Sequence, residues 1–282
     1  MSNGSYPQSG ITPHPGRIGI FDSGVGGLTV LSEIYRQLPN ESVLYFGDTA
    51  RLPYGSKSAE EILHFVRQIL TWMADQQVKM VMMACNTSSA LALDRVQAEF
   101  PFPILGLIRP GAQAAALASK RIGVIATAAT VNSNAYPEAI QELVSDCQVW
   151  QVGCPDFVSI VENNQIQHPS TRAVAQTYLQ PLLKAEIDTL IYGCTHYPHL
   201  ASVFRGILPS GTRYINPAVS MVTAAARELD ALGLRSTTPA WPTEFCVSGS
   251  ARQFRQLAVQ WLGHQPQVGQ INLPALTLSR LS

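Results

Sequence analysis

The chain alternates short runs of apolar residues with longer segments in which apolar residues recur every three or four positions. The short runs have the length of buried β-strands, and the longer segments have the period of amphipathic helices. This alternation predicts an α/β fold with mostly parallel sheets. Strands are expected at 17–22, 42–46, 78–84, 104–108, 121–126, 148–152 and 187–192 and near Phe245, and the clearest helices at about 58–76, 88–99, 170–184, 216–232 and 251–261.

Two of the apolar runs end in the same way. One leads through Ala84 into Cys85-Asn86-Thr87, and the other leads through Gly193 into Cys194-Thr195-His196. A buried parallel strand that meets small polar residues has reached its carboxyl edge, and open α/β sheets bind their ligands just outside that edge. The pattern predicts that each half of the chain delivers one cysteine to a ligand-binding edge.

The two halves of the chain share further features. The run that ends at Asp22 resembles the run that ends before Thr127, and the spacing from Asp22 to Cys85 is close to that from Thr127 to Cys194. We therefore predict two similar α/β domains with mostly parallel sheets, related by pseudo-twofold symmetry, with the active site in the interdomain cleft. The two cysteines would then lie on opposite walls of that cleft.

Domain boundaries follow from the order of the predicted elements. The first α/β domain is expected at 17–108 plus 218–282, where Asp22 and Cys85 lie, and the second at 109–217, where Cys194 and His196 lie. Residues 1–16 are rich in Ser, Pro, Gly and Gln and are expected to form a flexible tail.

Two opposed cysteines are suited to moving protons. A thiolate can remove a proton from a carbon next to a carboxylate, while a thiol on the other wall returns a proton to the opposite face, which inverts the stereocentre. Asn86, Thr87, Thr195 and neighbouring backbone amides could hold the substrate carboxylates. The alternative is that both cysteines are small core residues, and their shared sequence context argues against it. Three further cysteines lack that context and are expected to be packing residues: Cys147, Cys154 and Cys246.

Other polar residues near these motifs allow more than one interpretation. His196 is expected to tune Cys194 or relay its protons, and His199 is expected to be structural. A zinc site at Cys194, His196 and His199 is disfavoured, because Pro198 disrupts a regular helix and no fourth ligand is evident. The glycine-rich turn after Asp22 lacks the third glycine of a dinucleotide-binding motif, but amides there could still hold a carboxylate.

Bulk composition excludes several other classes of protein. The chain has 19 basic and 19 acidic residues among 282, and it contains no basic run, so net charge does not suggest a nucleic-acid partner. No apolar stretch approaches the roughly 20 residues that a spanning helix needs, so no membrane association is expected. The five cysteines form no CxxC pair and follow no secretory signal, which predicts a cytoplasmic protein with reduced thiols.

Four blocks of sequence carry a family resemblance. They are 19–30, 45–55, 84–90 and 193–198, and they span much of the chain in order. In these blocks the sequence resembles the bacterial glutamate racemases, which interconvert L- and D-glutamate without a cofactor for peptidoglycan synthesis. The resemblance implies two α/β domains, a homodimer, glutamate as the small-molecule substrate, and no pyridoxal phosphate, which fits a chain with four lysines in no recognisable motif.

The resemblance also implies roles for individual residues. Cys85 is similar to the family's base toward D-glutamate and Cys194 to its base toward L-glutamate, with Asp22 and His196 assisting the two thiols. Asp48 and Glu162 match acidic positions with lesser supporting roles. The implied substrate contacts are Asp22, Ser23, Tyr54, Gly55, Asn86, Thr87, Thr195 and His196. Two alternatives stay open: a related racemase acting on aspartate or another amino acid, and a non-catalytic two-lobed amino-acid-binding protein.

Overall fold

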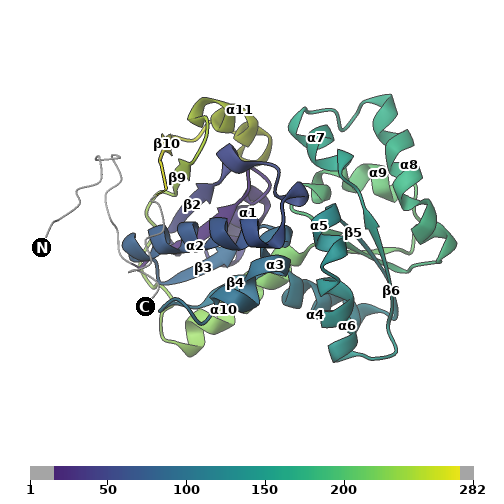
Figure 1. The fold of residues 1–282 in the computed structure, drawn as a ribbon, viewed down its shortest axis with the longest axis horizontal. Helices are drawn as coiled ribbons and strands as arrows, with labels where there is room; N and C mark the ends of the chain where they lie inside the picture. The colour runs from purple at the N-terminus through teal and green to yellow at the C-terminus, as the bar shows by residue number, and fades with distance from the viewer. Residues whose placement is uncertain (1–15, 274–282) are drawn as a thin grey trace, which may run out of the picture.

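The computed structural model describes residues 16–273, which form two β-sheets, each of parallel strands, with helices packed against them (Figure 1). The first sheet has the strand order β10-β9-β2-β1-β3-β4 and the second has the order β6-β5-β7-β8. We call each sheet with its helices the first and the second unit. The tail expected at 1–16 lies outside the described residues except for Gly16.

The strands of the first sheet are β1 (Ile18–Asp22), β2 (Val43–Gly47), β3 (Met80–Met83), β4 (Ile104–Gly106), β9 (Glu244–Val247) and β10 (Val268–Gln270). Those of the second are β5 (Arg121–Ala126), β6 (Gln148–Gly153), β7 (Thr189–Gly193) and β8 (Arg213–Ile215).

The four strands of the second sheet repeat the order of β2-β1-β3-β4 in the first. β1 pairs in parallel with β2 and β3, and β3 pairs with β4. In the same way β5 pairs with β6 and β7, and β7 pairs with β8. Each central strand is therefore followed along the chain by its two neighbours and then by an edge strand. The predicted fold class, two α/β units with mostly parallel sheets, is confirmed.

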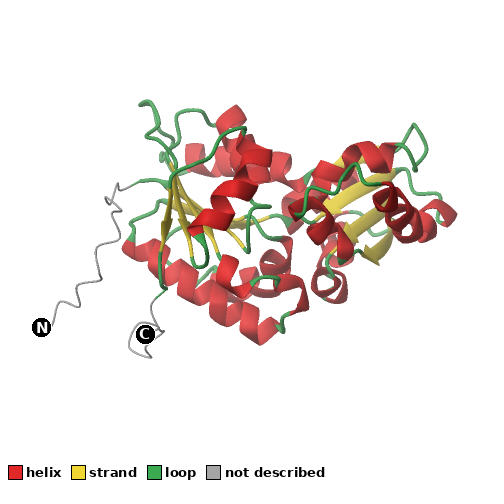
Figure 2. Ribbon diagram, turned by 90° about the horizontal axis from the view of Figure 1, so that it is seen from above, coloured by secondary structure: helices red, strands yellow, loops and turns green. Residues whose placement is uncertain are grey.

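Helices cover both faces of the first sheet, as the view from above shows (Figure 2). These helices are α1 (Leu28–Gln37), α2 (Ala59–Asp75), α3 (Asn86–Val96), α10 (Pro217–Ala231) and α11 (Ala251–Leu262). The remaining α-helices are α4 (Ile108–Ala118), α5 (Ala128–Asn132), α6 (Ala135–Leu143), α7 (Asp156–Glu162), α8 (Pro169–Lys184) and α9 (Ala201–Arg205). Ile18 and Ile20 of β1 belong to the core on one face, and Phe21 belongs to the core on the other. Because β1, β2 and β3 are buried on both faces, they are apolar at nearly every position.

Two predicted elements have different boundaries in the structure, and two edge strands were not predicted. The strand expected at 104–108 ends at Gly106, and α4 begins at Ile108, because Pro110 is compatible with the first turn of a helix. The helix expected at 88–99 begins earlier, at Asn86, directly after Cys85. The short strands β8 and β10, at the edges of their sheets, were not predicted, because three partly exposed residues do not produce an apolar run.

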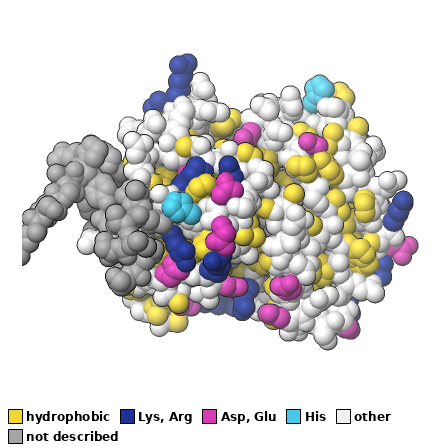
Figure 3. All heavy atoms as spheres, in the orientation of Figure 1, with side chains coloured by type: hydrophobic (Ala, Val, Ile, Leu, Met, Phe, Trp, Pro, Cys, Tyr) yellow, Lys and Arg dark blue, Asp and Glu magenta, His cyan; other side chains and the backbone are white. Residues whose placement is uncertain are grey.

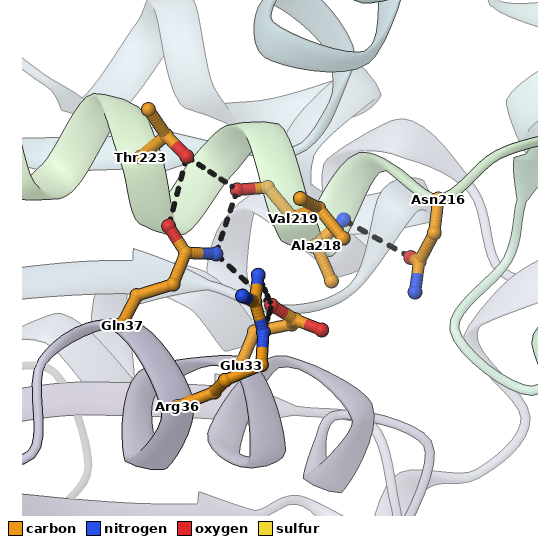
Figure 4. Close-up of polar contacts among 7 residues, drawn as sticks. All are labelled: Glu33, Arg36, Gln37, Asn216, Ala218, Val219 and Thr223. Carbon is orange, nitrogen blue, oxygen red and sulfur yellow. Dashed lines mark hydrogen bonds and ion pairs between the residues drawn. The ribbon is translucent and has the colours of Figure 1, made fainter.

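The chain returns from the second unit to the first through α10. The Asn216 side chain caps this helix by accepting a hydrogen bond from the Ala218 amide at 3.1 Å. The apolar side of α10 lies in the same core cluster as β1 and α1. Its polar side is bound to Gln37 at the end of α1, which donates to the Val219 carbonyl at 3.1 Å and accepts from the Thr223 hydroxyl at 2.8 Å (Figure 4).

The surface carries mixed charge. On the face drawn in Figure 3, Lys and Arg side chains lie interspersed with Asp and Glu side chains. Among residues 16–273, no helix combines the length and apolar character that crossing a membrane requires.

Candidate active site

A pocket of about 280 Å³ lies where the strands of both sheets end. Its lining comes from the segments that follow strands β1, β2 and β3 of the first sheet and β5, β6 and β7 of the second. Carboxyl ends of parallel strands are the usual ligand edge of an α/β sheet, and here the two edges share one pocket. The lining residues are Asp22, Ser23, Leu52, Pro53, Tyr54, Gly55, Ser56, Cys85, Asn86, Thr87, Thr127, Ala128, Pro155, Val158, Gly193, Cys194, Thr195 and His196.

The pocket brings together both cysteines and all eight of the expected substrate contacts. The two acidic residues that were assigned supporting roles lie behind the lining. Asp48 contacts Tyr54, and Glu162 contacts His196. The other three cysteines, which were expected to be packing residues, are buried and do not line the pocket.

On the side of the pocket that carries Cys85, backbone amides hold the carboxylate of Asp22. Asp22 ends β1 and accepts hydrogen bonds from the amides of Gly24 at 3.1 Å and Gly27 at 2.9 Å. The glycine-rich turn therefore does hold a carboxylate, but it belongs to the protein. Burial raises the pKa of Asp22 above its ordinary value, against the lowering effects of His196 and of these amides. Burial and the nearby Asp22 raise the pKa of the Cys85 thiol to about 12, so this thiol is protonated at neutral pH.

The Cys194 wall has a different electrostatic character. Cys194 Sγ lies 3.7 Å from His196 Nδ1, and His196 Nε2 lies 3.1 Å from Glu162 Oε1. Burial lowers the pKa of His196, but hydrogen bonds to Cys194 and Glu162 raise it by more, to about 10. An imidazolium beside a thiol favours the thiolate.

His199 takes no part in this arrangement. Its ring packs on Trp261 of α11 with 4.5 Å between centroids, and burial and the charge on His196 lower its pKa to about 4. Among residues 16–273, no group of three or more His, Cys, Asp and Glu side chains could hold a metal ion.

Comparison with known proteins places the chain in a family. Residues 18–229 match the model of the Asp/Glu/Hydantoin racemase family. The chain belongs to this family. The glutamate racemase of Gloeothece citriformis is 61% identical over 265 residues, which cover 94% of this chain and 95% of that protein. The relationship makes this protein an isomerase.

Solved structures of similar proteins agree with this placement. A crystal structure of a glutamate racemase isoform from Bacillus anthracis superposes with a TM-score of 0.89 at 38% identity and covers 94% of this chain and 100% of that chain. A glutamate racemase from Francisella tularensis in complex with D-glutamate has a TM-score of 0.87 at 35% identity and covers 92% and 98% of the two chains.

Asp48 organises one side of this racemase pocket. It is fully buried, forms an ion pair with Arg51 at 2.7 Å, and accepts hydrogen bonds from the Tyr54 hydroxyl and from the Ser248 hydroxyl at 2.7 Å. Because Tyr54 lines the pocket, Asp48 sets the position of the lining from behind.

Sequence reasoning missed several residues of the site. Thr127 lines the pocket, and its hydroxyl lies 2.9 Å from that of Thr87 across the two units. Its place at the end of β5, which corresponds to the place of Asp22 at the end of β1, was the signal that could have identified it. Two more were missed because they lie far from both cysteine motifs in the sequence and no local pattern marks them: Tyr136, whose hydroxyl donates to Asn86 Oδ1, and Ser248, whose hydroxyl donates to Asp48 Oδ1.

Gly26 of the first unit lies directly against Thr195 and His196 of the second. A Cβ atom at this position would lie 2.5 Å from the Cε1 and Nδ1 atoms of His196, and the Thr195 hydroxyl lies close to the same point. We therefore expect Gly26→Ala to displace the His196 ring from its place in the pocket and lower kcat/KM on the order of 100-fold, because a displacement of about 1 Å in an active site costs about that much.

The measurement is steady-state kinetics on folded protein, with circular dichroism as the check of folding. Gly211→Ala is the matched control, because a Cβ at Gly211 meets nothing within 4 Å. Equal activity of the two variants would show that the contact between Gly26 and His196 does not set the geometry of the site.

Proposed function

We propose that this protein is a glutamate racemase that interconverts L- and D-glutamate by a two-base mechanism without a cofactor, and that it supplies D-glutamate for peptidoglycan synthesis. The observation that carries the proposal is that two thiols line one pocket, each beside a different buried acid–base partner. The relative at 61% identity, itself a glutamate racemase, supports glutamate as the substrate.

In the proposed reaction one cysteine removes the α-proton and the other returns a proton to the opposite face. In the direction from L- to D-glutamate, the Cys194 thiolate removes the α-proton, and the Cys85 thiol gives its proton to the opposite face of the planar carbanion. The Cys85 side then carries the thiolate and Cys194 carries the proton, ready for the reverse reaction. Donors at Asn86, Thr87 and Thr195 line the same pocket and hold the carboxylates of the substrate. Those that face the α-carboxylate also stabilise the negative charge that spreads onto it.

The resting enzyme is poised toward L-glutamate. Cys85 is a thiol because burial and Asp22 raise its pKa to about 12, while Cys194 lies next to a His196 whose pKa of about 10 keeps it cationic at neutral pH. At neutral pH the Cys85 side of the pocket therefore offers a proton, and the Cys194 side offers a sulfur atom beside an imidazolium. The L to D direction requires this arrangement, with the acid at Cys85 and the base at Cys194.

We further propose a cytoplasmic homodimer. All five cysteines are free thiols, which supports a reducing compartment. The division into domains at 17–108 plus 218–282 and 109–217 stays a proposal, and it is supported by the packing of α10 in the core of the first unit.

The direct test is proton NMR of the purified protein with L-glutamate in D₂O, without pyridoxal phosphate. We expect the α-proton signal to disappear and the optical rotation to decay. Both changes on aspartate, with neither on glutamate, would move the assignment to the related racemase. Binding of glutamate without exchange of its α-proton would favour the non-catalytic binding protein.

Each thiol is expected to be essential. Cys85→Ala and Cys194→Ala should each lower the racemisation rate on the order of 10³–10⁴-fold, because each removes one of the two groups that transfer the proton. Cys246→Ala and Cys147→Ala are matched controls, since both cysteines are buried and neither lines the pocket. Racemisation at the wild-type rate by either pocket variant would disprove the two-base assignment.

The two thiols should also differ in reactivity. At pH 8 we expect iodoacetamide to alkylate Cys194 at least about tenfold faster than Cys85, because the raised pKa of Cys85 keeps it protonated and only a thiolate is an effective nucleophile. Exposure does not explain such a difference, since the two residues are 7% and 6% exposed. Peptide mapping by mass spectrometry measures both rates, and His196→Gln should abolish the preference. Faster labelling of Cys85 in the wild-type protein would contradict the assigned resting state.

A further inference from the structure

A hydrogen bond between the two units holds one lining residue in a defined orientation. Tyr136, in α6 of the second unit, donates its hydroxyl to Asn86 Oδ1 at 2.7 Å. Asn86 is the first residue of α3 in the first unit and lines the pocket. Both side chains are buried, Tyr136 fully and Asn86 to 3% exposure. The bond therefore acts at low dielectric and away from competing water.

The contact leaves one group of the amide unused. Asn86 Nδ2 is buried and has no hydrogen-bond partner among residues 16–273. A buried amide N–H without an acceptor costs free energy, so such a group in a native protein needs an explanation. The carboxylates of an amino-acid substrate in the same pocket are acceptors that would pair with it.

The direction of the bond determines what the amide offers. An asparagine side chain has an acceptor end and a donor end that exchange places when the amide rotates by half a turn. Burial raises the pKa of Tyr136 above its ordinary value, so its hydroxyl keeps its proton and remains a donor. While that proton is bound to Oδ1, Nδ2 is the end of the amide that is free for an anion.

We propose that Tyr136 is a positioning residue of the racemase pocket: its hydroxyl fixes the Asn86 amide so that Nδ2 donates to a carboxylate of the bound substrate. The proposal rests on the proposed function, because it takes an amino dicarboxylate as the ligand. Tyr136 touches no substrate itself and acts through Asn86. It also makes substrate binding depend on the second unit, although Asn86 belongs to the first.

The kinetic consequence is specific. A fixed donor to a carboxylate that stays charged throughout the reaction stabilises the bound substrate and the transition state alike, so its loss raises KM more than it lowers kcat. We expect Tyr136→Phe to raise KM about tenfold for both L- and D-glutamate, as for loss of a hydrogen bond to a charged group, and to change kcat less than about threefold. A purely structural tyrosine would lower the melting temperature and leave the KM of the folded enzyme unchanged.

A double-mutant cycle tests whether Tyr136 acts through Asn86. Asn86→Ala should lower kcat/KM on the order of 100-fold. The remaining activity can still be measured by α-proton exchange. In that background Tyr136→Phe should add less than about twofold, because the group that it orients is gone. Effects that multiply in the double variant would overturn the proposal.

Asn86→Asp tests the orientation of the amide without changing Tyr136. The aspartate keeps an acceptor for the Tyr136 hydroxyl but replaces the Nδ2 donor with a carboxylate oxygen. We expect its KM to exceed that of Asn86→Ala, since like charges then meet in the pocket. A KM for Asn86→Asp near that of the wild type would show that the amide faces the substrate with its oxygen, and would overturn the proposal even if Tyr136→Phe failed to fold.

Tyr178→Phe is the matched control. Tyr178 also belongs to the second unit and donates one side-chain hydrogen bond, to Asp156 Oδ2 at 2.6 Å, but neither residue lines the pocket. Its KM should equal that of the wild type, and a tenfold rise would count against any special role of Tyr136. Wild-type protein that fails to exchange the α-proton of glutamate would overturn the proposed function together with this inference. If the wild-type protein is active but the effects of Tyr136→Phe and Asn86→Ala on kcat/KM multiply in the double variant, the inference alone is overturned.

Discussion

A parallel strand that is buried on both faces can carry polar side chains only where it leaves the sheet. The central strands β1 and β7 are buried along their whole length, and their polar chemistry begins at Asp22 and directly after Gly193. Because all strands of one sheet are parallel, their carboxyl ends lie at one edge. The positions of Asp22, Cys85, Cys194 and His196 in one pocket follow from this constraint once the two edges are brought together.

The two units share a topology but not their chemistry. Asp22 ends β1 where Thr127 follows β5, and the residue two positions after the cysteine is Thr87 in one unit and His196 in the other. Two identical walls would give two thiols with the same protonation state. A proton relay across a substrate needs one base and one acid at the start of each turnover, so the proposed reaction depends on the ways in which the two units differ.

Much of the fold was predictable because its signals are local. Fully buried strands produce continuous apolar runs, and the start of the helix predicted at about 58–76 is marked by Ser58 and Glu61, which form a capping box. The edge strands β8 and β10 escaped prediction because pairing with a neighbouring strand, and not their own three residues, defines them. The pocket residues named from the two cysteine motifs and the family resemblance lie together in one pocket. Tyr136 and Ser248 could not be predicted, because each enters the site through a contact with a residue at least 50 positions away in the sequence.

These long-range contacts do more than complete the lining. The Thr29 hydroxyl donates to the Thr195 carbonyl at 2.9 Å, and the hydroxyls of Thr87 and Thr127 lie at the same separation, so both bonds join the first unit to the second. Neither carries a charge, and neither titrates at the pH values at which the thiols and His196 would exchange protons in the proposed reaction. The two sides of the pocket are thus joined by neutral hydrogen bonds, while the groups that would change charge in the proposed reaction line the pocket. A racemase must return to the same geometry after each proton transfer in either direction, and bonds that are indifferent to protonation maintain that geometry while the charge moves from one wall to the other.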